Sequence, residues 1–468
     1  MYMRNPKFLF RFVMSLILGA GCVITWSGVT SYSSARRAMQ DAASRPSAAE
    51  AARFLQQSTW GPTPDLISHV QDVWFEQFLQ EQFNAPISSF PTLPLVLSMH
   101  PADCPTGTIC YRDNYTLYPV QTRFYTNALY GEDQLRQRVA FALHQILVVN
   151  GLDIGQGYPS HLTPYLQVLN NDAFENFDKL LYDITLNAAM GNYLDMANNK
   201  ATNPNENYAR EILQLFTIGL NRLNPDGSPM HDSFGQTIPT YDQTIINAFA
   251  RVFTGWTFAV AQTTEIANYI DPMRPIASNH DTDAKTLLRG VTLPKGQSAV
   301  KDLNDALQNI FQDPNVGPFI GRQLIQHLVT SNPSPAYVER ITNVFNNDRD
   351  NERGDIRAVV RAILLDPEAR SNPTSQSGHL IHPVLLVTNL LRALNARSAD
   401  GTGQSDGYLD PQSVLMGMDV FSPPSVFSYF SPFGGVPGSS GLRGPEFGLL
   451  NTSTALRRAN FVNTLVFG

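Results

Sequence analysis

A short stretch near the middle of the chain concentrates acidic, amide and basic side chains before it turns apolar. It reads NNKATNPNENYAREILQLFTIG, residues 198–219. Free N–H groups and the helix dipole attract anions to the start of a helix. We therefore expect this stretch to bind a carboxylate, a phosphate or sugar hydroxyls. The expected ligand-binding residues are Asp195, Asn205, Asn207 and Arg210, and the candidate catalytic carboxylate is Glu211.

A second group of reactive side chains follows later in the chain, in NHDTDAKTLLRG, residues 279–290. A histidine next to an aspartate can act as a general base with its orienting partner, or both can bind a metal; a solvated loop is the alternative. If Asp281 and Glu211 faced each other across a cleft, the pair would supply acid and base roles. We take His280 and Asp281 as further candidate catalytic residues and Lys285 as a ligand-binding residue.

The first stretch also has a purely structural interpretation. Asn203 is a suitable N-cap, and Glu206 stands three residues later, as in a capping box. Glu206 and Arg210 are four residues apart and can pair on one helix face. A calcium loop from Asp195 to Glu206 is disfavoured, because Lys200 stands where glycine is required. The sequence leaves the structural and the ligand-binding interpretations both open.

Composition limits the class of protein that presents these residues. The chain has 468 residues, 43% of them hydrophobic, and a net charge of −7. It has no basic run or stripe, so nucleic acid is a poor candidate partner. The sequence patterns of serine hydrolases, zinc proteases and nucleotide-binding loops do not occur in it. The sequence therefore identifies no cofactor, and it leaves metal binding unknown.

The N-terminus has the pattern of an export signal. Basic residues precede an apolar run, residues 12–26, and a small-residue spacer follows. We assign residues 1–35 to a signal peptide or an uncleaved signal anchor, and residues 36–47 to a linker. Acylation of Cys22 is an alternative. The expected location is periplasmic, at the cell surface or secreted, with membrane contact only through this segment if it stays uncleaved.

Two cysteines remain beyond the N-terminal segment. Cys104 and Cys110 bracket a Pro-Thr-Gly-Thr turn. In an oxidising compartment the two thiols should form a disulfide. A two-thiolate metal site is the rival interpretation, but the sequence offers it no further cysteine and no nearby histidine.

Residues 48–468 are predicted to form a single large helical domain. Segments such as TPDLISHVQDVWFEQFLQEQF repeat apolar residues at three- and four-residue spacing, which is typical of one helix face. Strand patterns are scarce, so we predict an all-α fold with long Gly/Pro-rich loops and few or no strands. The Phe-rich stretch at 419–435 is either a lid over the helical core or a platform on which sugar rings stack.

Taken together, these motifs resemble the bacterial DUF 1800 family, over about residues 48–465. The resemblance rests on Asn-Glu-Asn-x-Ala-Arg-Glu at 205–211, Thr-Gly-Trp at 254–256 and His-Asp-x-x-x-Lys at 280–285. The family is named for its unknown function, and it implies a largely helical exported protein. The residues that match its motifs are Asn205, Glu206, Asn207, Arg210, Glu211, Trp256, His280, Asp281 and Lys285. Of the candidate residues, those expected to be structural are Asn203, Glu206 and Trp256.

The resemblance also implies a partner. Genes of the family often neighbour those of a second uncharacterised family, which resembles the alkaline phosphatase and sulfatase fold. The chain departs from the family near its end, where PPSVFSYFSP replaces a Pro-Pro-Asn-Val-x-Gly-Trp segment.

Two functions fit these expectations. The first is hydrolysis of an extracellular or cell-surface polymer, such as a glycan, by Glu211, His280 and Asp281. The alternative is a non-catalytic binding or assembly protein that acts with an exported partner. Both interpretations require the two polar segments to meet at one solvent-reachable hollow.

Overall fold

The computed structural model describes residues 45–96, 100–155, 157–263, 266–398, 408–432, 434–439 and 441–467. In these residues α-helices dominate and strands form only short antiparallel pairs, which confirms the predicted helical class. The expected export signal, most of the linker and Cys22 lie outside the described residues. None of the described helices is long and apolar enough to cross a membrane.

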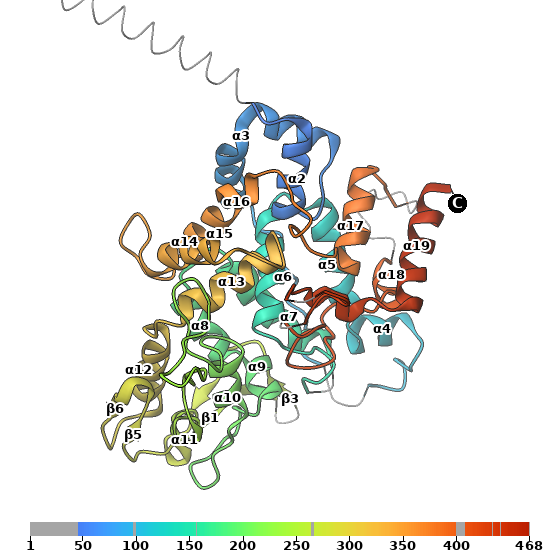
Figure 1. Ribbon diagram of the computed structural model, residues 1–468. Helices are drawn as coiled ribbons and strands as arrows, with labels where there is room; N and C mark the ends of the chain where they lie inside the picture. Colours follow the sequence, from blue (N-terminus) through green and yellow to red (C-terminus); the bar gives the residue numbers. More distant parts are fainter. Residues whose placement is uncertain are drawn as a thin grey trace, which may run out of the picture.

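The first two described helices form one end of the molecule, at the top of Figure 1. Helix α2 spans Ala48–Ser58 and packs on α3, Pro64–Asn84. Ser47 and Glu50 form a reciprocal capping box at the start of α2, in which each side chain accepts a hydrogen bond from the other residue's backbone N–H. Helix α3 is interrupted at Trp74, where φ is +70°.

The next helices surround α6, which is buried along nearly its whole length. Helix α6 packs against α3, α7 and α13, so it is the central helix of the fold. The bounds in this part are α5 Tyr118–Tyr130, α6 Gln134–Ile146, α7 Pro159–Asp172, α8 Phe177–Leu186, α9 Ala188–Tyr193, α10 Asn207–Gln214 and α11 Gln243–Val252.

The second half of the chain adds a helical layer around α13. Helix α13 packs against α14 and α15 on one side and α6 on the other. One continuous hydrophobic cluster therefore extends from Ala51 to Leu449. The bounds here are α12 Ala299–Phe311, α13 Val316–Leu328, α14 Pro335–Asn346, α15 Ile356–Leu365, α16 Pro367–Arg370 and α17 Pro383–Ala393.

All named strands fall between residues 256 and 293, the aperiodic part of the sequence. They form three two-stranded antiparallel pairs, at the end of the molecule opposite α2 and α3 (Figure 1). The pairs are β1 Trp256–Thr257 with β4 Arg274–Pro275, β2 Ala259–Thr263 with β3 Ile266–Asn268, and β5 Lys285–Thr286 with β6 Thr292–Leu293. Two 3-10 turns separate them, η1 Ala277–Asn279 and η2 Leu288–Gly290.

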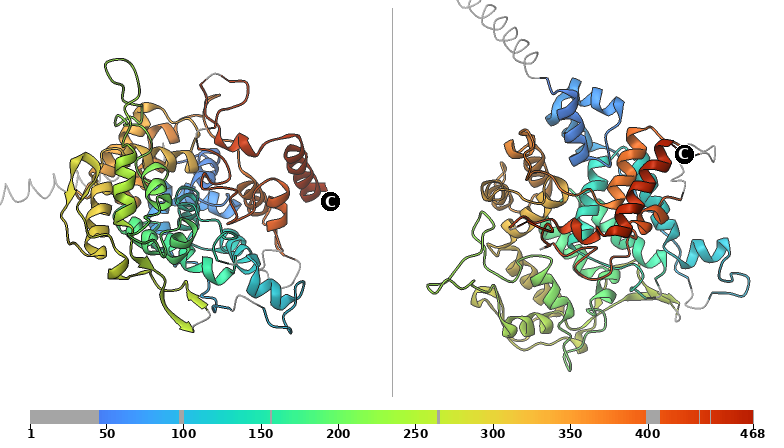
Figure 2. Two further views of the ribbon diagram at one scale, coloured as in Figure 1. Left: turned by 90° about the horizontal axis from the view of Figure 1, so that it is seen from below. Right: turned by 45° about the vertical axis from the view of Figure 1, so that its right-hand side comes forward.

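Residues 220–240 form a ribbon that projects from the body of the molecule (Figure 2). Phe234, near its tip, is 86% exposed. The base of the ribbon is held by Asn315, the N-cap of α13, whose side-chain amide donates to the carbonyls of Ile218 and Asn221 at 2.9 and 2.8 Å. Arg322, further along α13, also donates to the ribbon, at the Gly227 carbonyl at 3.1 Å.

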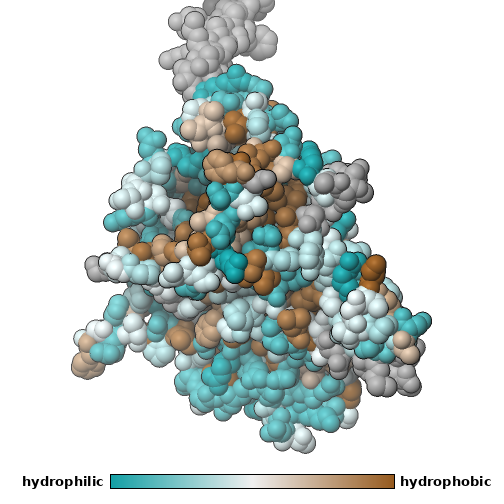
Figure 3. Space-filling view, turned by 90° about the vertical axis from the view of Figure 1, so that its right-hand side faces the viewer, coloured by the Kyte–Doolittle hydropathy of each residue, from teal (hydrophilic) through white to brown (hydrophobic). Residues whose placement is uncertain are grey.

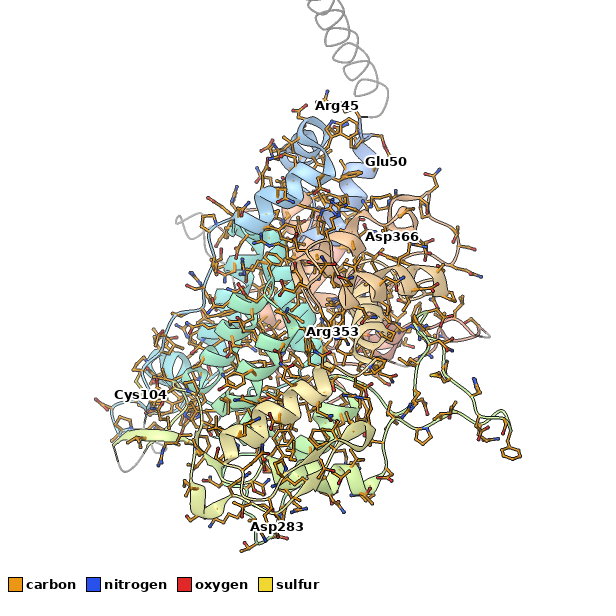
Figure 4. All side chains as sticks on the ribbon, turned by 90° about the vertical axis from the view of Figure 1, so that its left-hand side faces the viewer. Arg45, Glu50, Cys104, Asp283, Arg353 and Asp366 are labelled. Carbon is orange, nitrogen blue, oxygen red and sulfur yellow. A yellow bond between two sulfur atoms is a disulfide. The ribbon has the colours of Figure 1, made fainter. Side chains whose placement is uncertain are left out.

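The expected disulfide is present. Cys104 and Cys110 are bonded at 2.01 Å, so the disulfide prediction is confirmed. The bond closes the turn that leads into α4, Ile109–Tyr115, on an outer flank of the molecule where Figure 4 labels Cys104.

The C-terminal elements cover one side of the helical body. Helix α18, Asp410–Leu415, lies between α17 and α19, Thr452–Phe467, and η3, Pro445–Leu449, precedes α19. Figure 3 views this side and shows hydrophobic residues gathered in its upper part. Apolar side chains of α19 are exposed, with Leu456 at 60% and Phe467 at 83%.

We predict that Gly61 sets the approach of α2 to α17. Its φ is +142°, and a Cβ there would lie 2.6 Å from the Asn389 backbone. Gly61→Ala should destabilise the fold by at least about 2 kcal/mol, because it adds a steric clash to backbone strain. Gly296→Ala is the matched control, since its φ is +90° but its surroundings are open. Equal losses in urea unfolding would contradict the close approach.

Candidate functional site

The first polar stretch folds as a tight loop between α9 and α10. Asp195 and Asn198 both have positive φ, 57° and 66°. The Asn207 side-chain amide donates to the Asp195 carboxylate at 2.6 Å, and both side chains reach solvent. Asp195 and Asn207, two expected ligand-binding residues, are thus brought together at the surface.

Asn199 is the centre of this loop, and it is only 5% exposed. Its Oδ1 accepts from the Asn205 N–H at 2.8 Å, and its Nδ2 points to the carbonyls of Ala250 and Phe253 at 3.5 and 3.4 Å. The side chain of Asn205 in turn accepts from the Asn207 N–H at 2.8 Å. The oxygen expected to bind a ligand is therefore used to start the helix.

The expected capping box at Asn203 is wrong. Helix α10 begins at Asn207 with Glu206 as its N-cap, and the Glu206 side chain makes no capping hydrogen bond. Asn203 instead forms a β-bridge with Lys200. The loop needs these residues to turn back after α9, so the helix starts later than the sequence pattern predicts.

Glu206 and Arg210 form the ion pair that their spacing permits. Arg210 donates to the Glu206 carboxylate at 2.7 Å, and Gln243 of α11 donates to the same oxygen at 2.9 Å. Both charged side chains are about two-fifths exposed, so the pair adds little stability. Arg210, an expected ligand-binding residue, is engaged with its own helix.

Glu211 is the one candidate catalytic residue with a free polar atom. Its Oε2 is buried and has no hydrogen-bond partner among the described residues. Burial raises the pKa of Glu211, and the nearby charge of Arg210 opposes this. Burial and the Glu211 charge together raise the pKa of Tyr241 to about 12. The carboxyl thus lies close to the Tyr241 hydroxyl, which is also buried without a partner.

The His280 loop is organised by buried charges. The His280 side chain is 1% exposed, with Nδ1 2.9 Å from the Thr254 carbonyl and Nε2 3.1 Å from the Asp302 carboxylate. Lys285 donates to the same Asp302 oxygen at 2.7 Å and to the Asp283 carbonyl at 2.9 Å. Lys285 therefore neutralises Asp302, which is fully buried, and His280 lies within hydrogen-bond distance of the same oxygen.

Asp281 has a different partner on the same loop. Arg251 of α11 binds it through two nitrogens, at 2.8 and 2.9 Å. Although burial opposes the shift, the hydrogen bond from Arg251 lowers the pKa of Asp281 to about 2. A carboxylate held this way is a poor proton acceptor at neutral pH.

Asp283, labelled in Figure 4, lies at the end of the molecule opposite Glu50.

The two polar segments do lie side by side. The Ala201 N–H donates to the Asn279 carbonyl at 2.9 Å, and the Asn198 N–H donates to the carbonyl of the buried Trp256 at 2.7 Å. However, His280 is sealed from solvent and Asp281 is held by Arg251. The expectation of a shared catalytic hollow is corrected for these two residues, because their polar atoms bind the protein itself.

A groove that the sequence analysis missed runs along α13. Two adjoining cavities, of about 330 and 30 Å³, share walls on α10, α13 and the C-terminal Phe-rich segment. We call them the α13 groove, and both are lined by Leu215, Phe319, Gln323, Gln326 and Pro432. The spacing of Phe319, Gln323 and Gln326 places them on one helix face, which is a detectable signal.

Amides and aromatic rings line the groove together with aliphatic and proline side chains. Gln145 of α6 lines its smaller cavity with Phe427 and Phe430 of the Phe-rich segment. Gln323 Nε2 and Gln145 Oε1 are buried without a hydrogen-bond partner among the described residues. Nearly all buried polar atoms in proteins are paired, so these two atoms are available to a ligand that enters the groove.

Among the described residues, no group of three or more His, Cys, Asp or Glu side chains is arranged to hold a metal ion. The side chains that the sequence offered as metal ligands, His280 and Asp281, instead hydrogen-bond Asp302 and Arg251.

We predict that Lys285 is required for folding. Lys285→Met should cost about 3–5 kcal/mol in urea unfolding, because it leaves the buried Asp302 carboxylate with one fewer partner. Lys295→Met is the matched control, since Lys295 pairs with Asp283 at an exposed site. If both variants unfold at the same urea concentration, the buried network does not stabilise this loop.

We predict that Glu211→Gln stabilises the protein at high pH. A carboxyl whose folded pKa is raised above its unfolded value, 4.5, destabilises the fold as pH rises through that interval. In urea unfolding, the variant should therefore have a higher midpoint than the wild type near pH 8 and the same midpoint near pH 4. The exposed Glu132→Gln is the control. A Glu211→Gln variant that is less stable near pH 8 would assign the carboxylate a structural role.

Comparison with known proteins adds a family but no activity. No curated protein and no solved structure matches the chain. One family model does match, described as "Protein of unknown function (DUF1800)", and it covers residues 53–466. Because this match spans nearly the whole chain, the protein belongs to the DUF1800 family.

Proposed function

We propose that the protein binds a hydroxyl-rich polymer, such as a glycan, in the α13 groove. The observation that carries this proposal is the pair of unpartnered amide atoms, Gln323 Nε2 and Gln145 Oε1. One is a donor and the other an acceptor, and both line the groove. A sugar hydroxyl both donates and accepts, so the hydroxyls of a glycan can pair with atoms of both kinds.

The rest of the groove suits the same ligand. Phe319, Phe427 and Phe430 offer rings that stack on the apolar faces of sugars. Phe427 is 41% exposed, so its ring is accessible. The larger cavity, about 330 Å³, falls within the usual size range of ligand pockets.

Binding is favoured over hydrolysis because two of the three residues first expected to be catalytic are occupied by contacts within the protein. His280 and Asp281 are engaged in the buried charge network, and Glu211 is left without them. Export is part of the proposal and is supported by the disulfide. Cooperation with an exported partner of the phosphatase- and sulfatase-like family is also part of it, and it rests on the resemblance alone.

One observation favours a second candidate function, hydrolysis of the bound polymer. Glu446 lines the smaller cavity and is 4% exposed. Burial raises the pKa of Glu446, although the Ser331 hydroxyl donates to it at 3.1 Å. A carboxyl whose pKa is raised beside a ligand can act as a general acid.

The test is calorimetric titration of the full chain with a neutral glucan, a polyuronate and a chitin oligosaccharide. At least one should bind, and Gln323→Ala should weaken that binding by about tenfold through the lost hydrogen bond. Gln80→Ala, at an exposed site on α3, should bind like the wild type.

The same samples separate binding from hydrolysis. Release of reducing ends that Glu446→Gln abolishes would establish hydrolysis instead of simple binding. The absence of binding to all three polymers, or equal binding by Gln323→Ala and the wild type, would refute the proposal.

A further inference from the structure

Five cationic or imidazole side chains from four parts of the chain converge beneath the segment that leads into α17. The charge of Arg138 acts on all three histidines of the group, and that of Arg458 acts on His382. We call this group the basic cluster. Its members are Arg138 of α6, His327 of α13, His379 and His382 before α17, and Arg458 of α19.

The cluster has no counter-ion. Arg138 is 1% exposed, and no carboxylate pairs with it or with Arg458 in the part of the chain that the structure describes. Burial lowers the pKa of Arg138 to about 10. The guanidinium has only the His327 carbonyl, at 3.2 Å, and the ring of Trp60, 5.3 Å from its centroid. A buried charge left in this way is costly to the fold.

Several nitrogens of the cluster are also unused. Arg138 Nε, His379 Nδ1, His382 Nδ1 and two nitrogens of Arg458 are buried without a hydrogen-bond partner among the described residues. The arginine nitrogens are donors, whereas burial lowers the pKa of His379 to about 4, so its ring is neutral near pH 7 and Nδ1 donates only in one tautomer. His382 is 3% exposed, so its ring is nearly sealed, like Arg138. Unpaired charge and unpaired donors thus occur in the same place.

The cluster can be reached from outside. His379 lines a cavity of about 700 Å³ between α2, α16 and α17. On its other side, His379 and Arg458 both line an open hollow between α17 and α19. An ion that enters either cavity meets His379, and the open hollow also presents Arg458. Arg138 and His382 line neither cavity, but the charge of Arg138 acts on both His379 and His382.

We propose that the basic cluster binds a phosphate or sulfate group. The Arg458 guanidinium at the open hollow supplies the forked donors that match such oxyanions, and Arg138 adds a positive charge that acts on His379. The dianion offsets the uncompensated charge of Arg138, and its several oxygens accept from the unused nitrogens. The size of the cavity beside His379 admits the group either as a free ion or as an ester of a larger molecule.

The test is calorimetric titration of the full chain at constant ionic strength, with inorganic phosphate, inorganic sulfate, glycerol 2-phosphate and chloride. Phosphate, sulfate or the ester should bind at one site, and chloride should not. Tighter binding of glycerol 2-phosphate than of phosphate would identify an ester as the ligand. Arg458→Gln and His379→Gln should each weaken binding by at least about tenfold, as expected for a lost hydrogen bond to a charged group.

Arg274→Gln is the matched control, since Arg274 is exposed on β4 at the far end of the molecule, and it should bind like the wild type. Arg138→Met supplies a second readout by thermal unfolding. Millimolar phosphate should raise the melting temperature of the wild type but not that of Arg138→Met. The proposal fails if no oxyanion binds, or if phosphate stabilises Arg138→Met and Arg458→Gln as much as the wild type, because that is the general effect of excluded salts.

Discussion

The carboxylate of Asp302 has no access to solvent, so it must be neutralised where it lies. Lys285 supplies the opposite charge, and His280 from the same short loop contacts the same carboxylate. Their positions determine the path of residues 276–286. The loop crosses Gly255 so closely that a Cβ there would lie 2.9 Å from the His280 Cβ. Gly255 in turn donates to the Asn199 carbonyl, and this bond ties the first polar loop to the second. Two family motifs are thereby explained as parts of one packing constraint.

Charge is distributed unevenly between the surface and the interior. The chain carries a net charge of −7, yet the basic cluster at its centre contains two arginines and no acid. The Asp302 network is the opposite case, because there each buried charge has its partner. Arg392 is also buried with no carboxylate partner among the described residues, but three backbone carbonyls accept from it. Several nitrogens of the basic cluster are instead unused, and this contrast supports the proposed oxyanion site.

The features that could be predicted from the sequence are those that depend on local spacing. Helical periodicity identified the class of fold, and the short Cys104–Cys110 spacing identified the disulfide. The fate of His280 could not be predicted, because its partner Asp302 belongs to a later helix that reads as an ordinary amphipathic segment. The predicted cap at Asn203 was wrong because the buried Asn199 side chain accepts from the Asn205 N–H and so fixes the conformation of the loop.

Sites assembled from distant segments were beyond the reach of the sequence. The α13 groove combines α6, α10, α13 and the Phe-rich segment, and none of them shows a catalytic pattern by itself. The basic cluster brings together Arg138 and His382, which are separated in the sequence by more than half of the helical domain. Its histidines occur in QLIQHLVT and SGHLIHPV, where a single-sequence pattern indicates only helix and turn.

The ribbon at 220–240 has a mechanical consequence. Because Asn315 at the start of α13 holds its base and Arg322 of the same helix binds the Gly227 carbonyl, a load applied near Phe234 is carried through these two side chains to α13. The same helix presents Phe319 and Gln323 to the groove one and two turns further on. A displacement of the ribbon tip is therefore expected to move α13, the helix that forms one wall of the groove.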